Sequence, residues 1–321
     1  MKPFRKHVAI AVDGGGIKGI IAARALSMLE DCLGKPIHDI FRLAAGTSTG
    51  SIISAGLASG LTAHQMFDLY TELGNTIFPK SLRSLLWPIS RYRYPNEPLV
   101  SALNKVIGAK KMGDFWTANP PTDVVLTTFD LVDNHTRFVK PWKDEYKDWP
   151  VVRAVLASSS VPTYFPIVEG RYVDGGVGSY ANPCYLAAYE INYCLNWDPA
   201  ETTLISLGTG RDPHKLQPYQ ADRYLSWQWL GPVLGAFLQS ADDQQVNLVS
   251  TFFNKLDFRR FQVNLQQPFD MDDPTKIPQL TAYGEEMGRM IQNDIYDSAL
   301  QIVAARAPVK KEEIIPVPSL N

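Results

Sequence analysis

The stretch HVAIAVDGGGIKG, residues 7–19, carries the strongest indication of the fold. Its first six residues form an apolar run typical of a buried strand, and three consecutive glycines follow closely. Residues 20–34 then place apolar side chains at helical spacing and end in Gly34, a residue type that commonly terminates helices. A buried strand that passes through a glycine loop into a helix predicts a parallel α/β fold.

Later segments repeat this alternation of strands and helices. A strand pattern occurs in residues 40–46, 122–133, 136–140, 170–174 and 202–207, and a helical pattern in residues 51–60, 148–161 and 182–195. We therefore expect a three-layer α/β/α fold with a mostly parallel central sheet, in one domain over residues 1–306. Within this domain we expect motifs over residues 8–210 and mainly helices over residues 211–306, followed by a loosely ordered tail at 307–321.

The composition is that of a globular protein with no strong global charge. Of 321 residues 45% are hydrophobic, enough for a large core, and the net charge of −2 argues against nucleic acid as a partner. Cys32, Cys184 and Cys194 follow no metal-ligand or disulfide spacing. No segment reaches the ~18 apolar residues of a membrane span. These features predict a cytoplasmic protein.

A serine lies in a tight turn after the second predicted strand. Gly46-Thr47-Ser48-Thr49-Gly50 fits the pattern G-x-S-x-G, in which a strained strand-to-helix turn lifts the serine hydroxyl out of the sheet edge. Gly46 and Gly50 are needed because a Cβ at either position would keep the strand and the helix apart. The alternative is an ordinary turn in which Ser48 only caps the following helix.

The glycine loop admits two interpretations. Residues 14–19, GGGIKG, satisfy the dinucleotide-binding pattern G-x-G-x-x-G, but that site needs an acidic residue after the second strand, and Asp39 lies before it. The backbone N–H groups of Gly14, Gly15 and Gly16 instead offer an anion cradle at a helix N-terminus. Beside a nucleophilic serine, such a cradle would be an oxyanion hole.

The base that would activate Ser48 has two candidates. His214 follows a predicted strand end and would complete a Ser48–Asp174–His214 order, the arrangement of a carboxylesterase. Alternatively, Asp174 acts alone: it ends a predicted strand and is followed by Gly175 and Gly176, which permit close approach of another segment. In a dry pocket its pKa would rise from ~3.9 and make it an adequate base. A plain turn-forming role for Asp174 is the third possibility.

Taken together, the motifs resemble those of the patatin-like phospholipases. The matching segments are DGGGIKG (13–19), GTSTG (46–50), ASSSVPTYFP (157–166), DGG (174–176), NP (182–183) and SLGTG (206–210). They occur in the family's order over about two thirds of the chain, residues 8–210, so their combination is far more specific than any one of them.

The resemblance implies a lipid acyl hydrolase that cleaves fatty acyl esters of phospholipids or other acyl lipids without metal or cofactor. It makes Ser48 the nucleophile, Asp174 its base and Gly14, Gly15 and Gly16 the oxyanion loop. The supporting motif positions are Asp13, Lys18, Gly19, Gly46, Gly50, Gly175 and Gly176, with Lys18 where Arg is more frequent and Gly176 where plant members have Ala. A catalytically idle lipid-binding protein remains the alternative from another functional class.

Two aromatic segments are candidates for contact with lipid. Residues 84–99 combine Trp87, Tyr92 and Tyr94 with arginines, a composition typical of membrane-facing surfaces, although an ordinary surface loop has the same composition. A transient peripheral contact with membranes is therefore a hypothesis. Residues 227–238 are a candidate wall for acyl chains, or part of the core.

Overall fold

The computed structural model describes residues 1–79, 91–213, 216–217 and 219–297. Its strands are β1 (His7–Val12), β2 (Leu43–Gly46), β3 (Asp123–Asp130), β4 (His135–Val139), β5 (Tyr172–Asp174), β6 (Thr202–Leu207) and β7 (Asp257–Phe261). Its α-helices are α1 (Gly19–Leu33), α2 (Thr49–Ala58), α3 (Ala63–Ile77), α5 (Glu97–Ile107), α6 (Asp114–Thr117), α7 (Val151–Ser159), α8 (Cys184–Tyr189), α9 (Leu230–Phe252) and α10 (Ile277–Gln292).

The strands form one mixed sheet with the order β4-β3-β2-β1-β6-β7, and β5 pairs with β3 beside this path. The pairs β1–β2, β1–β6, β2–β3 and β6–β7 are parallel, whereas β4 and β5 run antiparallel to β3. The antiparallel β3–β4 hairpin turns through Asn134, which has a positive φ of 55°. The predicted mostly parallel sheet is confirmed.

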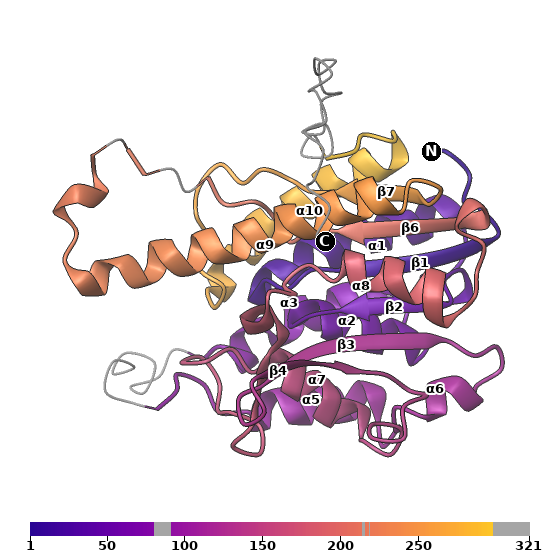
Figure 1. The fold of residues 1–321 in the computed structure, drawn as a ribbon, viewed down its shortest axis with the longest axis horizontal. Helices are drawn as coiled ribbons and strands as arrows, with labels where there is room; N and C mark the ends of the chain where they lie inside the picture. Colours follow the sequence, from indigo (N-terminus) through magenta and orange to yellow (C-terminus); the bar gives the residue numbers. More distant parts are fainter. Residues whose placement is uncertain (80–90, 214–215, 218, 298–321) are drawn as a thin grey trace, which may run out of the picture.

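Helices cover both faces of the sheet (Figure 1). Alternate residues of β1 explain this arrangement: Val8, Ile10 and Val12 pack in the cluster that contains α1, α2, α3 and α10, whereas Ala9 and Ala11 pack against α8 and α9. Helices α5 and α7 extend the first layer over β3. The α/β/α layers expected from the sequence are therefore present, with strand side chains buried on both faces as parallel sheets require.

The edge strand β7 was not predicted. Its sequence DFRRF places two arginines inside a strand, and we expected residues 211–306 to be mainly helical. Arg259 and Arg260 are nevertheless buried, because each forms an ion pair with a buried carboxylate. An apolar pattern could not reveal this strand, since its buried side chains include charged ones.

One strand brings the two candidate catalytic segments together. Strand β4 occupies one edge of β3, so β2 and β5 must both pair with the other edge. Strand β2 ends at Gly46 opposite Leu126, and β5 arrives from the other direction and ends at Asp174 opposite Thr128. The ends of β2 and β5 therefore face each other across a single residue of β3.

No helix in the described residues is long and apolar enough to cross a lipid bilayer.

Candidate active site

Ser48 occupies a strained turn between β2 and α2. Its backbone has φ 55° and ψ −124°, a conformation that non-glycine residues rarely adopt. The flanking glycines permit this turn: a Cβ on Gly46 would lie 2.3 Å from the carbonyl oxygen of Gly50, and one on Gly50 would lie 2.0 Å from that of Val12. The backbone N–H of Ser48 donates to Ser158 Oγ at 3.1 Å, which fixes the turn from the end of α7.

Asp174 lies beside this serine and is almost completely buried. Its Oδ1 accepts a hydrogen bond from the Gly176 N–H at 2.7 Å, and the Ser48 hydroxyl also acts on the carboxylate as a hydrogen-bonding neighbour. The contact with Ser48 does not reach full hydrogen-bond geometry: Oδ2 of Asp174 has no hydrogen-bond partner among the described residues. Catalytic hydrogen bonds are often long or misaligned before substrate binds, so this arrangement is compatible with a nucleophile and its base.

Burial raises the pKa of Asp174 from 3.8 to about 6, while the nearby Ser48 hydroxyl and the hydrogen bond from the Gly176 N–H partly offset the effect. Desolvation disfavours the carboxylate form, and no positively charged group is among the causes of the shift. The carboxylate is therefore more basic than an exposed aspartate, yet it is still largely ionised at neutral pH.

The glycine loop contacts the serine turn directly. A Cβ on Gly14 would lie 3.1 Å from Ser48 Cβ, so the loop packs closely against Ser48. The Gly14 N–H already donates to the Ala181 carbonyl at 2.8 Å. The N–H groups of Gly15 and Gly16, by contrast, donate no hydrogen bond to any described residue. Of the three glycines predicted for an oxyanion hole, the structure thus leaves two with available donors.

The supporting motif positions have identifiable structural roles. Asp13 pairs with Arg260, and Lys18 Nζ donates to Asp212 Oδ2 at 2.9 Å. Gly19 leaves no room for a side chain, because a Cβ there would lie 2.2 Å from Thr49 Oγ1. At Gly175 a Cβ would lie 2.0 Å from Thr127 Oγ1, and that oxygen bonds Thr47 Oγ1 at 2.7 Å in the turn before Ser48.

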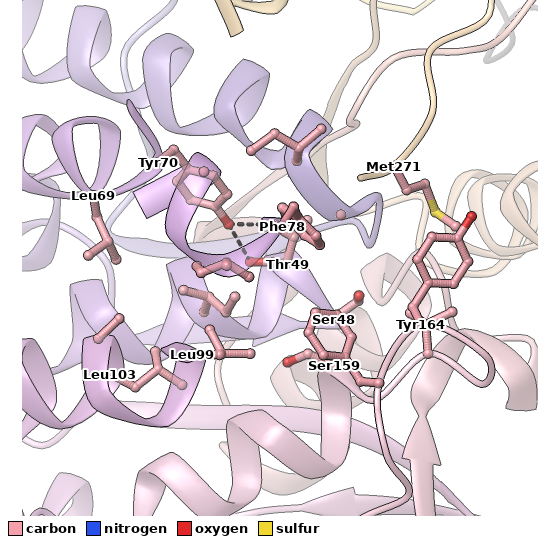
Figure 2. Close-up of a pocket in the computed structure, with 18 residues that line it drawn as sticks. Ser48, Thr49, Leu69, Tyr70, Phe78, Leu99, Leu103, Ser159, Tyr164 and Met271 are labelled. Carbon is pink, nitrogen blue, oxygen red and sulfur yellow. Dashed lines mark hydrogen bonds between the residues drawn. The ribbon is translucent and has the colours of Figure 1, made fainter. Parts of the chain in front are cut away.

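An apolar cavity extends from Ser48 between α2, α3 and α5 (Figure 2). Figure 2 shows Leu69 and Leu103 at one end, and Ser48 and Ser159 toward the other, where Tyr164 and Met271 also lie. Its lining is Gly16, Ile17, Ser48, Thr49, Ile52, Leu69, Tyr70, Gly74, Ile77, Phe78, Leu99, Ala102, Leu103, Ser159, Val161, Tyr164, Phe165 and Met271. The cavity has a volume of only about 70 Å³, so it is a narrow slot. No titratable carboxyl, amine or imidazole group is among these residues, and such a slot suits a hydrocarbon chain.

Comparison with known proteins identifies the family. The model of the patatin-like phospholipase family matches residues 10–188, more than half of the chain. The chain belongs to the patatin-like phospholipase family. At the level of the family, this makes it a lipid acyl hydrolase.

Other patatin-like proteins align over different shares of their length. "Patatin-like protein 2" of Arabidopsis thaliana is 28% identical over 80% of this chain and 74% of its own. "Intracellular phospholipase A2" of Caenorhabditis elegans is 29% identical over 64% of this chain but only 19% of its own. The "cGAMP-activated phospholipase" of Vibrio cholerae is 27% identical over 65% of this chain and 66% of its own. The crystal structure of VipD from Legionella pneumophila shares the fold, with a TM-score of 0.50 and 12% identity over 91% of this chain and 67% of its own.

Several predicted residues of this patatin-like chain lie elsewhere than expected, or outside the described residues. Tyr94, which we considered for a membrane surface, is buried against Phe78 and Phe165, and its hydroxyl donates to Asp272. Trp87, His214 and residues 307–321 lie outside the described residues, as do the side chains of residues 230–238.

The sequence analysis missed the walls of the slot and the support of the turn. Helices α3 and α5 contribute most of the far wall, but they are ordinary amphipathic helices without a motif. Within the ASSSVP segment, Ser158 bonds the backbone of Ser48 and the Ser160 carbonyl accepts the Asp174 N–H at 3.0 Å. The run of three serines was a signal that could have indicated this role.

Proposed function

We propose that this protein is a phospholipase-type serine hydrolase in which Ser48 is the nucleophile and Asp174 the general base. The observation that carries the proposal is the meeting of the strained Ser48 with a buried carboxylate at one end of an apolar slot. Oδ2 of Asp174, which lacks a partner among the described residues, is the atom we assign to the proton transfer. The slot would hold the acyl chain of the scissile ester.

The reaction proceeds in two halves. Asp174 accepts the hydroxyl proton as Ser48 Oγ attacks the ester carbon, and the carbonyl oxygen becomes an oxyanion that accepts hydrogen bonds from the N–H groups of Gly15 and Gly16. The tetrahedral intermediate then breaks its bond to the leaving alcohol, which takes the proton from Asp174. Water gives a proton to Asp174 and attacks the acyl-Ser48 ester, and the fatty acid leaves as Ser48 regains its proton.

The raised pKa of Asp174 supports this role. A base is most effective when its pKa lies near the working pH, because it is then both ionised and sufficiently basic. A carboxylate with a pKa of about 6 meets this condition without an imidazole. In this mechanism kcat/KM increases with pH through about 6 and then levels off, because only the ionised form of Asp174 accepts the proton.

The test replaces each member of the pair and a matched neighbour. Ser48→Ala should abolish labelling by a fluorophosphonate and reduce phospholipid hydrolysis at least ~10³-fold, and Asp174→Asn should reduce hydrolysis ~10²–10⁴-fold. Ser54→Ala is the serine control, since Ser54 is buried in α2 but bonds the Ala45 carbonyl away from the slot. Asp123→Asn is the carboxylate control, since burial also raises the pKa of Asp123, at the other end of β3.

Three results would contradict the proposal. Labelling that persists in Ser48→Ala would exclude Ser48 as the nucleophile. A ~10⁴-fold loss in His214→Ala would indicate the Ser–Asp–His carboxylesterase instead of the dyad. A wild-type protein that is neither labelled nor active on any acyl ester would be a lipid-binding protein without catalysis.

We also propose that the protein contacts membranes peripherally through the segment between β6 and α9. This segment follows β6 in the chain, and its residues 219–229 lie beyond the sheet in Figure 1, together with the first turns of α9. It exposes Tyr219, Leu225 and Trp229 to solvent. Since the site lies at the carboxyl ends of the parallel strands, a surface that anchors here would bring lipid close to Ser48.

A further inference from the structure

The first residue of the glycine loop is held by a buried arginine from the C-terminal part of the chain. Asp13 directly precedes Gly14, and both of its carboxylate oxygens accept hydrogen bonds from Arg260, at 2.9 and 2.5 Å. Arg260 lies on β7 and has no exposed surface. This two-point contact fixes the orientation of the Asp13 carboxylate as well as its position, because the guanidinium presents its donors in a rigid plane.

The same arginine connects three other segments to this point. It donates to Ser206 Oγ on β6 and to Asp242 Oδ1 on α9, both at 2.9 Å. Asp242 Oδ1 in turn accepts a hydrogen bond from Asn182 Nδ2 at 2.6 Å. The network therefore joins β6, β7, α9 and the segment after Asp174 to the beginning of the glycine loop.

Two neutral hydrogen bonds fix the next residue. Thr209 Oγ1 donates to the Gly14 carbonyl at 2.7 Å, and the Gly14 N–H donates to the carbonyl of Ala181, the neighbour of Asn182. The Thr209 side chain also occupies the space that a Cβ on Gly15 would need, at 2.3 Å from Oγ1. Asp13 is thus held through its N–H and its carboxylate, and Gly14 through its N–H and its carbonyl, immediately before the two glycines whose N–H groups have no partner among the described residues.

Stability alone does not account for this arrangement. Buried ion pairs contribute little net stability, because desolvation of the charges offsets their attraction. In addition, Arg260 Nε is buried without a hydrogen-bond partner in the described part of the chain. Its neighbour Arg259 is as deeply buried and pairs with Asp257. Its other hydrogen bonds go to the carbonyls of Lys2 and Pro3, and none of these partners belongs to the glycine loop.

We propose that Arg260, together with Thr209, is a positioning residue that holds the glycine loop so that the N–H groups of Gly15 and Gly16 converge on the oxyanion. The inference rests on the proposed function of Ser48 and Asp174. It gives β7 and α9 a role in catalysis, although none of their described side chains lines the slot. Displacement of a reacting group by ~1 Å can cost ~10²-fold in rate, so small movements of Asp13 are sufficient for the effect.

The main test compares Arg260→Lys with the matched control Arg259→Lys. Each keeps the charge and loses the two-point contact, so both should lower the unfolding temperature. Only Arg260→Lys should reduce kcat, by ~10–100-fold, with KM changed less than ~3-fold. It should also weaken the binding of an acyl trifluoromethyl ketone inhibitor by the same factor by which it lowers kcat/KM. The ketone is chosen because its adduct with Ser48 carries the oxyanion. Equal losses in both variants, or unchanged kcat in folded Arg260→Lys, would overturn the proposal.

Thr209 keeps the proposal testable if Arg260→Lys does not fold. Thr209→Val retains the shape of the side chain and removes the hydrogen bond to Gly14, so it should reduce kcat ~10-fold, and Thr209→Ser should restore it. Normal kcat in folded Thr209→Val would contradict the inference, whether or not Arg260→Lys folds.

A measurement that does not depend on hydrolysis separates the two proposals. In protein labelled with ¹⁵N-glycine, the amide signals of Gly14, Gly15 and Gly16 should shift in Arg260→Lys and not in Arg259→Lys. If the signals shift in Arg260→Lys but the wild-type protein hydrolyses no ester, the proposed function fails while the positioning role stands. If the signals do not shift in Arg260→Lys and the wild-type protein is active, the positioning role fails while the proposed function stands.

Discussion

Asp174 combines two properties that are seldom found in one side chain of a protein interior. It is a buried carboxylate, yet no cation is paired with it, and its Oδ2 has no hydrogen-bond partner in the described residues. Such a group is costly to bury, and natural proteins retain such costs mainly where chemistry requires them. The strained backbone of Ser48, which follows the end of β2 that faces the end of β5, is a second cost at the same place.

This cost makes a prediction about stability. Because the folded pKa of Asp174 is raised from 3.8 to about 6, the ionised form disfavours folding above pH 6, and the effect vanishes below about pH 4. Asp174→Asn removes the charge and keeps an oxygen for the Gly176 N–H. We expect the variant to be inactive but more stable than the wild type at pH 8, by up to about 3 kcal/mol, with the gain lost as pH falls to 4.

The measurement is the free energy of unfolding in urea at pH 8, 6 and 4. Asp68→Asn, which changes an exposed carboxylate on α3, is the control and should show no such gain. A less stable Asp174→Asn at pH 8, or a difference that does not vary with pH, would show that the carboxylate is not desolvated as the structure indicates.

At the scale of elements, α3 and α5 determine how much of an acyl chain the slot accepts. Ala102 lines the slot on α5 and directly precedes Leu103, which lies far from Ser48 in Figure 2. Ala102→Leu should fill part of this space and lower kcat/KM ~10-fold or more for nitrophenyl esters of twelve to sixteen carbons, and leave the four-carbon ester within ~2-fold. The reason is that only a long acyl chain reaches the space that the new side chain fills. Exclusion from this space should cost the long-chain ester ~1–3 kcal/mol of binding free energy.

Ser101→Leu is the matched control, because Ser101 is the adjacent α5 residue and is exposed. It should change neither ester. If Ala102→Leu lowered both esters equally, the slot would not be where the acyl chain binds.

The elements also explain which parts of the structure could be predicted from sequence. The serine turn and the glycine loop are local: a few residues must adopt a rare backbone or approach closely, and glycine is the residue type that allows it. The position of Asp174 against Ser48 is not local, since it depends on β5 pairing with the same edge of β3 as β2. Strand β7 was hidden because Arg259 and Arg260 interrupt its apolar pattern, and the ion-pair partner of Arg260, Asp13, lies far away in the sequence.

At the scale of the whole molecule, the two ends of the parallel strands have different properties. The carboxyl ends of β1, β2 and β6 carry the glycine loop, the serine turn and the segment that precedes α9. Helix α9 then returns along the molecule, so that its last residues lie near the amino end of β7 (Figure 1). Exposed apolar side chains therefore lie in the segment just before α9 and at the last residue of α9, and only those before the helix are on the side of the site.

This geometry allows the membrane contact to be tested with a control on the same helix. Tyr219 and Leu225 are 83% and 63% exposed before α9, and Phe252 is 71% exposed at its last residue. The double variant Tyr219→Ser/Leu225→Ser should lower hydrolysis of phospholipid vesicles ~10-fold, because it removes apolar area worth ~1.5–3 kcal/mol per fully buried side chain. It should leave a soluble short-chain ester within ~2-fold, since neither residue lines the slot. Phe252→Ser should change neither activity, because this equally exposed ring is at the opposite end. A loss on vesicles that Phe252→Ser shares, or a loss on the soluble ester as large as that on vesicles, would mean that this segment does not dock the protein on lipid.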